Sequence, residues 1–94
     1  MSRWLRSGIR RDACIVLAGH DELPAQKLKT ALSKRYDERI DPADFRTMLD
    51  ELQRLGHVES HTEELTDVYS LTEAGESLVR DHYEWIRSHV DPEP

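Results

Sequence analysis

Apolar residues recur at helical spacing in the first part of the chain, between residues that favour turns. Residues 9–19 have an apolar centre, Ala13 to Ala18, which predicts a first helix buried on most sides, although periodicity alone leaves a strand open there. A second helix is predicted from Pro24, which suits a first helical position, to about Arg35. Its apolar stripe comprises Ala25, Leu28, Ala31, Leu32 and Tyr36.

The third predicted helix, Asp41 to Leu55, has the clearest boundaries in the sequence. Asp41 is a good N-cap, Pro42 fits the first turn, and Gly56 supplies a left-handed stop. The residues expected to face inward are Phe45, Met48, Leu49, Leu52 and Leu55.

Two short strands and a last helix are predicted after residue 56. The strands span residues 57–61 and 67–71 and are joined by residues 62–66. Thr72 caps a final helix that runs to about Val90, and a frayed tail follows it. The predicted fold is therefore mainly α with a small β-hairpin: a winged helix-turn-helix with three helices, a two-stranded wing and a C-terminal helix. In that fold the third helix lies in the major groove of DNA and the wing flanks it.

The length of 94 residues predicts one domain, with a core over about residues 9–71 and a C-terminal dimerisation helix over about residues 72–90. No apolar run approaches the ~20 residues of a membrane helix, and no signal-peptide pattern follows the N-terminal arginines. A single cysteine, Cys14, excludes an internal disulfide. We therefore expect a cytoplasmic protein that has no membrane partner.

Positive and negative charges are divided unevenly along the chain. The formal net charge is −6, but residues 1–39 carry nine bases and five acids, whereas residues 40–94 carry four bases and fourteen acids. This asymmetry indicates either an electropositive surface for a polyanion or chance clustering on a solvated surface. Ten arginines, three lysines and many acids resemble the composition of proteins from salt-loving organisms, which would make part of the acidity an adaptation.

Residues that suit contact with duplex DNA occur on the second and third predicted helices. Arg46 fits a bidentate contact to guanine, Thr47 a thymine methyl and Asp50 a cytosine amine, although Arg46 and Asp50 equally fit a surface ion pair. Basic residues around the second helix suit phosphate contacts better than base reading. The predicted DNA-binding residues are Lys27, Lys29, Lys34, Arg35, Arg39, Ala43, Arg46, Thr47 and Asp50. A further basic group forms either an arm that reaches the minor groove or a solvated terminus, and comprises Arg3, Arg6, Arg10 and Arg11.

The sequence predicts no catalytic site, no metal site and no cofactor. His57 and His61 share one face of a predicted strand with only glutamates near them in sequence, which is a poor ligand set for structural zinc. Cys14 is expected to be a small core residue, because a redox sensor needs an exposed, electropositive setting. The four glycines are isolated, so they form no phosphate loop, and a chain of this size is not expected to hold a pocket.

The last predicted helix has two adjoining apolar stripes. Together they form more apolar surface than the core of one monomer is expected to cover. Burying one stripe against a second copy gives a two-fold homodimer, which also sets two recognition helices one DNA turn apart. In the alternative, both stripes wrap the core of one monomer, helped by Trp4 and Leu5. The predicted dimer interface comprises Leu78, Val79, His82, Tyr83, Trp85, Ile86 and Val90.

Two motifs carry a family resemblance. The leucines of residues 45–55 lead into Gly56-His57-Val58-Glu59-Ser60, and Tyr69-Ser70-Leu71-Thr72-Glu73-Ala74-Gly75 follows the wing. Together they resemble the PadR family of winged-helix transcriptional regulators, over about residues 13–80. The resemblance implies a homodimer held by the terminal helices and a recognition helix at residues 42–55. Residues 62–67 are short and acidic where that family's wing is basic, which argues against phosphate contact by this wing.

The sequence thus predicts a dimeric winged-helix regulator of transcription that binds double-stranded DNA, as a repressor, and is not an enzyme. The alternative is a winged-helix protein–protein interaction module, whose acidic wing and third helix meet another protein without direct DNA binding.

Overall fold

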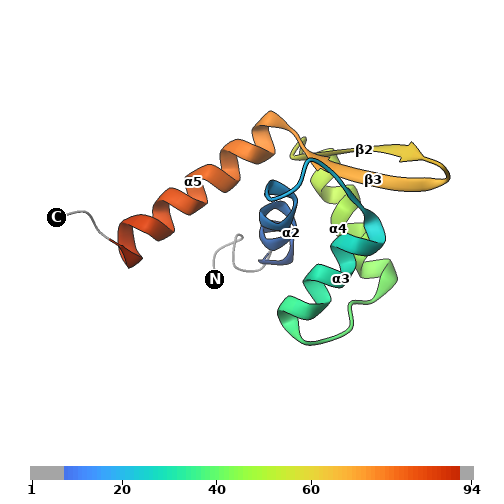
Figure 1. Ribbon diagram of the computed structural model, residues 1–94, viewed down its shortest axis with the longest axis horizontal. Helices are drawn as coiled ribbons and strands as arrows, with labels where there is room; N and C mark the ends of the chain where they lie inside the picture. The colour runs from blue at the N-terminus through green and yellow to red at the C-terminus, as the bar shows by residue number, and fades with distance from the viewer. Residues whose placement is uncertain (1–7, 92–94) are drawn as a thin grey trace.

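Four helices and a three-stranded antiparallel sheet make up the computed structural model, which describes residues 8–91 (Figure 1). The strand order is β1-β3-β2, so the third strand in sequence lies in the middle. Helices α2, α3 and α4 group together, while α5 and the β2–β3 hairpin extend from this group in opposite directions (Figure 1). None of the described helices is both long and apolar enough to cross a membrane.

Helix α2, Gly8–Ala18, packs against α3, α4, α5 and the central strand β3. Ala13, Cys14 and Leu17 lie in the core, whereas Ile15 is exposed. Ile9 and Val16 also pack against the core, so the prediction of burial on most sides is confirmed, except on the side that carries Ile15 and Ala18. Ile15 is exposed because its side of α2 faces an open cavity.

Strand β1, Leu23–Pro24, precedes α3, Ala25–Tyr36, and was not expected from the sequence. Leu23 pairs with Tyr69 and Pro24 with Val68 of the central strand, and two residues are too few to display the alternation of a strand. The helix consequently begins one residue later than predicted. At its other end, the Tyr36 hydroxyl donates to Asp12 Oδ2 at 2.5 Å and ties α3 to α2.

Helix α4, Pro42–Arg54, begins as predicted, because Asp41 Oδ2 accepts hydrogen bonds from the backbone N–H groups of Ala43 at 3.0 Å and Asp44 at 3.1 Å. Four of the five predicted inward residues are buried: Phe45, Met48, Leu49 and Leu52. Leu55 is 45% exposed, so its prediction is wrong: it follows the last helical turn, just before the chain reverses at Gly56 with φ 81°.

Strands β2, Val58–Glu63, and β3, Thr66–Leu71, form the wing and are joined by only two residues. The predicted five-residue connection is therefore too long. Glu64 and Leu65 adopt φ of 48° and 71°, the positive values that a tight hairpin turn requires, without the Asn or Gly that usually signals one. Thr62 Oγ1 donates to Asp67 Oδ1 at 3.0 Å across the ribbon beside this turn.

Helix α5, Glu73–Val90, is held to the rest of the molecule by its first turn and by packing of its first half against α2, with Val79 against the core. Thr72 Oγ1 accepts from the Gly75 N–H at 3.1 Å, as predicted for a cap, and donates to the Gly56 carbonyl at 2.6 Å. Gly75 is the only buried residue of α5, and a Cβ there would lie 2.1 Å from the His57 carbonyl oxygen. This close approach requires glycine.

Candidate nucleic-acid interface

The outer face of α4 carries four of the predicted DNA-binding residues, including the three predicted to read bases. Ala43, Arg46, Thr47 and Asp50 are all exposed, and the opposite side of the helix fills the core. Because the core side fixes the rotation of the helix, the side chains on its outer face have defined positions. An exposed helix is the element that the major groove of B-DNA admits.

Arg46 and Asp50 do not form the surface ion pair that the sequence left open; no such pair occurs within residues 8–91. The charged residues of the last turn of α4 behave differently, since Glu51 pairs with Arg54 and also with Arg10 at 3.5 Å. The Arg46 guanidinium at the centre of the exposed face therefore remains available for an external acceptor.

The wing lies beside α4. Burial raises the pKa of the Tyr69 hydroxyl; the charges of Asp67 and Asp50 raise it further, and that of Arg46 lowers it. The charges of Arg46 and Asp50 thus act on a buried tyrosine of the central strand. The wing and α4 also touch directly, because Gln53 Nε2 donates to Ser60 Oγ at 2.9 Å.

Three of the five predicted phosphate-binding residues gather at one surface hollow of about 520 Å³. Lys29 and Lys34 reach it from α3, and Arg39 reaches it from the turn before α4. Asp37 and Glu38 line the same hollow and reduce its positive charge. Lys27 and Arg35 are exposed but do not line it. The charge of Arg35 acts instead on the Tyr36 hydroxyl, beside Asp12 of α2.

The predicted N-terminal arm is only partly within the described residues. Arg3 and Arg6 lie outside them. Arg10 and Arg11 belong to α2, where Arg10 pairs with Glu51 at 3.5 Å and Arg11 with Asp12 at 3.2 Å. The arm prediction is wrong for these two residues, because the helix begins at Gly8 and fixes them against the body of the molecule.

A cavity of about 330 Å³ lies between α2, the end of α4 and α5, although no pocket was expected. It forms because α5 leaves the body after its first turns, so that the predicted interface residues Leu78, Val79 and His82 line the cavity without filling it. Cys14 borders the cavity but is 4% exposed, and burial raises the pKa of its thiol to about 11. A core role for Cys14 is confirmed.

The outer part of α5 leaves large apolar side chains uncovered. Tyr83, Trp85, Ile86 and Val90 are exposed within the described structure, and Trp85 lies between the rings of His82 and His89, at centroid distances of 6.1 Å and 4.7 Å. Trp4 and Leu5, the proposed helpers in the alternative of a single wrapped core, lie outside the described residues. The described residues of the chain therefore leave one apolar side of α5 without cover.

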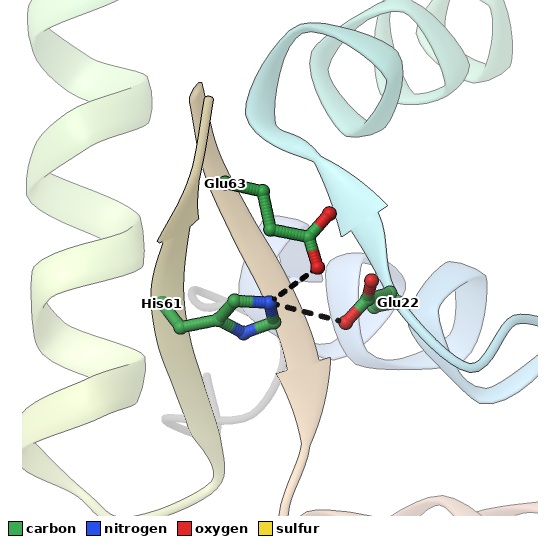
Figure 2. A group of neighbouring side chains, drawn as sticks. All are labelled: Glu22, His61 and Glu63. Carbon is green, nitrogen blue, oxygen red and sulfur yellow. Dashed lines mark hydrogen bonds and ion pairs between the residues drawn. The ribbon is translucent and has the colours of Figure 1, made fainter. Parts of the chain in front are cut away.

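The wing brings together three residues that the sequence did not group. His61 Nε2 lies 2.9 Å from Glu63 Oε2 and 3.5 Å from Glu22 Oε2, as Figure 2 shows. Hydrogen bonding to Glu63 raises the pKa of His61, and the charges of Glu22, Glu63 and Glu59 also raise it. Sequence analysis missed Glu22 because it becomes a neighbour of His61 only through the pairing of β1 with β3.

Comparisons with known proteins bear on the fold. No protein-family model matches the chain, and no curated protein does either. Several solved structures are similar. RosR of H. salinarum has a TM-score of 0.84 and 25% identity, over 92% of this chain and 78% of that one. A mutant MarR from E. coli, complexed with operator DNA, has a TM-score of 0.72 and 18% identity, over 84% of this chain and 54% of that one.

A third similar structure is F93 from STIV, a winged-helix DNA-binding protein, with a TM-score of 0.70 and 17% identity over the full length of both chains. These likenesses do not separate the PadR family from other winged-helix families, so the PadR resemblance stays a prediction. The order of elements and the likenesses agree on the fold itself: this chain is a winged helix, mainly helical, with a β-hairpin wing.

Proposed function

We propose that this protein is a DNA-binding transcriptional regulator that acts as a homodimer, with all 94 residues forming a single domain. The observation that carries the proposal is the outer face of α4, on which Arg46 and Thr47 point away from the core with no ion pair holding Arg46 among the described residues. In this proposal α4 enters the major groove, Arg46 contacts guanine and Thr47 contacts a thymine methyl. The similarity to a mutant MarR complexed with operator DNA supports the same role.

Phosphate contact is assigned to the basic residues around α3. Lys29, Lys34 and Arg39 already share one hollow, and Lys27 and Arg35 are exposed near it. Residues of this kind fix the position of a protein on the duplex without reading its sequence. The acidic wing takes no part in phosphate contact in this proposal.

The homodimer is assigned to α5, through its uncovered apolar side chains and the neighbouring Leu78, Val79 and His82. A two-fold dimer presents two α4 helices to two half-sites of one operator. A dimer bound in this way excludes other proteins from the operator, so we propose repression. We place the protein in the cytoplasm, where a thiol such as Cys14 stays reduced.

Selection of bound fragments from random duplex DNA, at several salt concentrations, tests this function. We expect an enriched sequence with two half-sites, and we expect Arg46→Ala to relax the preference at one base position of each half-site. A bidentate arginine–guanine contact contributes about 1–3 kcal/mol of discrimination. Arg80→Ala, an exposed arginine on α5, is the matched control and should keep the full preference. Recovery of no enriched sequence at any salt concentration would refute DNA reading.

A second candidate function, a protein–protein interaction module, is favoured by the wing. Glu63, Glu64 and Asp67 surround the tip, and Leu65 at the tip is 99% exposed. An acidic ribbon that presents an apolar side chain suits a basic protein surface better than a phosphate backbone. If the selection yields no DNA site, this is the function that the structure supports next.

A further inference from the structure

We propose that Glu22, His61 and Glu63 form a binding site for a divalent transition-metal cation of the Zn²⁺ type, on the exposed side of the wing. The three ligand atoms are one imidazole nitrogen and two carboxylate oxygens, all within 4.8 Å of one another. The site is separate from the outer face of α4, and its existence does not depend on DNA binding.

One ligand-to-ligand distance already fits a tetrahedral ion, and a second needs a small adjustment. Zinc binds histidine nitrogen and carboxylate oxygen at about 2.0–2.2 Å, so two ligands of one tetrahedral ion lie about 3.3–3.6 Å apart. His61 Nε2 lies 3.5 Å from Glu22 Oε2, within this range. Its 2.9 Å distance from Glu63 Oε2 is that of a hydrogen bond, and it needs to open by roughly half an ångström, within the reach of a side-chain torsion.

The backbone holds the three residues across the whole sheet. His61 lies opposite Val68, and Glu63 opposite Thr66, in the pairing of β2 with β3. Glu22 directly precedes Leu23, which pairs with Tyr69 on the other side of β3. A cation bound here therefore links the segment before β1 to β2 over the central strand, as the side chains in Figure 2 indicate.

The electrostatics also favour a cation. Among residues 8–91, no lysine or arginine forms an ion pair with Glu22 or Glu63; the positively charged group beside them is a histidine, which loses its charge when it deprotonates. Glu59 adds a third negative charge near the same ring. A divalent cation neutralises two adjacent carboxylates that the protein otherwise leaves without a permanent counter-charge.

The donor set selects the class of metal. Imidazole suits zinc and other late first-row cations, whereas Mg²⁺ and Ca²⁺ prefer oxygen ligands alone. Three protein ligands leave one tetrahedral position for water. Because all three side chains are exposed, the cation can enter from solvent without any movement of the backbone.

Titration calorimetry of Zn²⁺ into the full chain, after EDTA treatment and gel filtration, tests the site. We expect one Zn²⁺ per chain and a higher melting temperature with Zn²⁺ than without it. His61→Ala and Glu63→Gln should each weaken Zn²⁺ binding at least tenfold. Glu64→Gln, the next carboxylate along the wing, is the matched control and should bind as the wild type does. Circular dichroism of each variant confirms that it is folded.

Three results would overturn the proposal. The first is no Zn²⁺ binding up to millimolar concentration. The second is equal Zn²⁺ affinity in the wild type and in folded His61→Ala, which would place the cation elsewhere on the chain. The third is equal affinity for Mg²⁺ and Zn²⁺, which would indicate a general attraction of cations to an acidic wing.

Discussion

Helices α4 and α5 are both amphipathic, but the chain covers only one of their apolar faces. In α4, the side chains of Phe45, Met48, Leu49 and Leu52 are 2–6% exposed. In α5, Tyr83, Trp85, Ile86 and Val90 are 39–77% exposed. Helix α4 packs against α2 and the sheet, whereas α5 is held only over its first half, by its first turn and by α2.

This difference separates two roles. The burial of the inner side of α4 stabilises the fold and leaves a polar outer face for contact with a partner. The uncovered side of α5 adds little to the stability of one chain, and a contiguous apolar patch of this kind marks an interaction surface. The largest effects on folding should therefore come from α4 and its neighbours, and the largest effects on assembly from the outer half of α5.

Leu52→Ala should give the largest loss of folding stability. Leu52 is 2% exposed, and removing a fully buried leucine side chain costs about 2–5 kcal/mol, through lost burial and the cavity that remains. Leu55→Ala, three residues later in the chain and 45% exposed, is the control and should cost less than half as much. Urea unfolding measures both, and equal losses would contradict the burial described for α4.

Gly75→Ala should come next, because it disturbs the close contact between the first turn of α5 and the segment after α4. The new Cβ would lie 2.1 Å from the His57 carbonyl oxygen, so the backbone must shift, at about 1–3 kcal/mol. At Gly19 a Cβ would lie 3.6 Å from the Val16 carbonyl oxygen, which is ordinary contact. Gly19→Ala should therefore leave the melting temperature almost unchanged. If Gly75→Ala melts at the wild-type temperature, α5 is not anchored as described.

The pH dependence of folding stability tests whether Cys14 is buried in the core beside α2. Burial raises the pKa of its thiol to about 11 from an ordinary value of 9.0, so between pH 9 and 11 the folded chain keeps a proton that the unfolded chain releases. Stability should therefore fall as the pH rises through this window, by about 2–3 kcal/mol relative to Cys14→Ala. Urea unfolding of both proteins at pH 8 and pH 11 measures the difference. A constant difference would mean that the thiol is open to water.

The α4 region was largely predictable from the sequence, because each signal is local. Asp41, Pro42 and Gly56 mark the ends of the helix, and the spacing of its apolar residues separates the buried side from Arg46 and Thr47. The exception is Leu55, which continues the pattern in sequence but lies past the last helical turn.

The remaining features depend on contacts between distant segments, which periodicity does not contain. Strand β1 exists only because Leu23 and Pro24 meet the central strand, and the same pairing carries Glu22 to His61. The cavity beside Ile15 likewise depends on the direction in which α5 leaves Gly75. For α5, the sequence predicted an excess of apolar surface, and the structure shows which side chains form it. The second copy of the chain, which we propose covers this surface, is a partner that neither the sequence nor the structure of one chain contains.

Sedimentation equilibrium of the wild-type protein at micromolar concentration tests the central claim most directly, namely that the uncovered side of α5 is an assembly surface. We expect a mass twice the 11.0 kDa of one chain. Replacing Trp85 and Ile86 together with polar residues should give folded monomers, since burying each such side chain contributes about 1.5–3 kcal/mol to association. A wild-type mass near 11.0 kDa would contradict the claim, and with it the binding of two half-sites by one dimer.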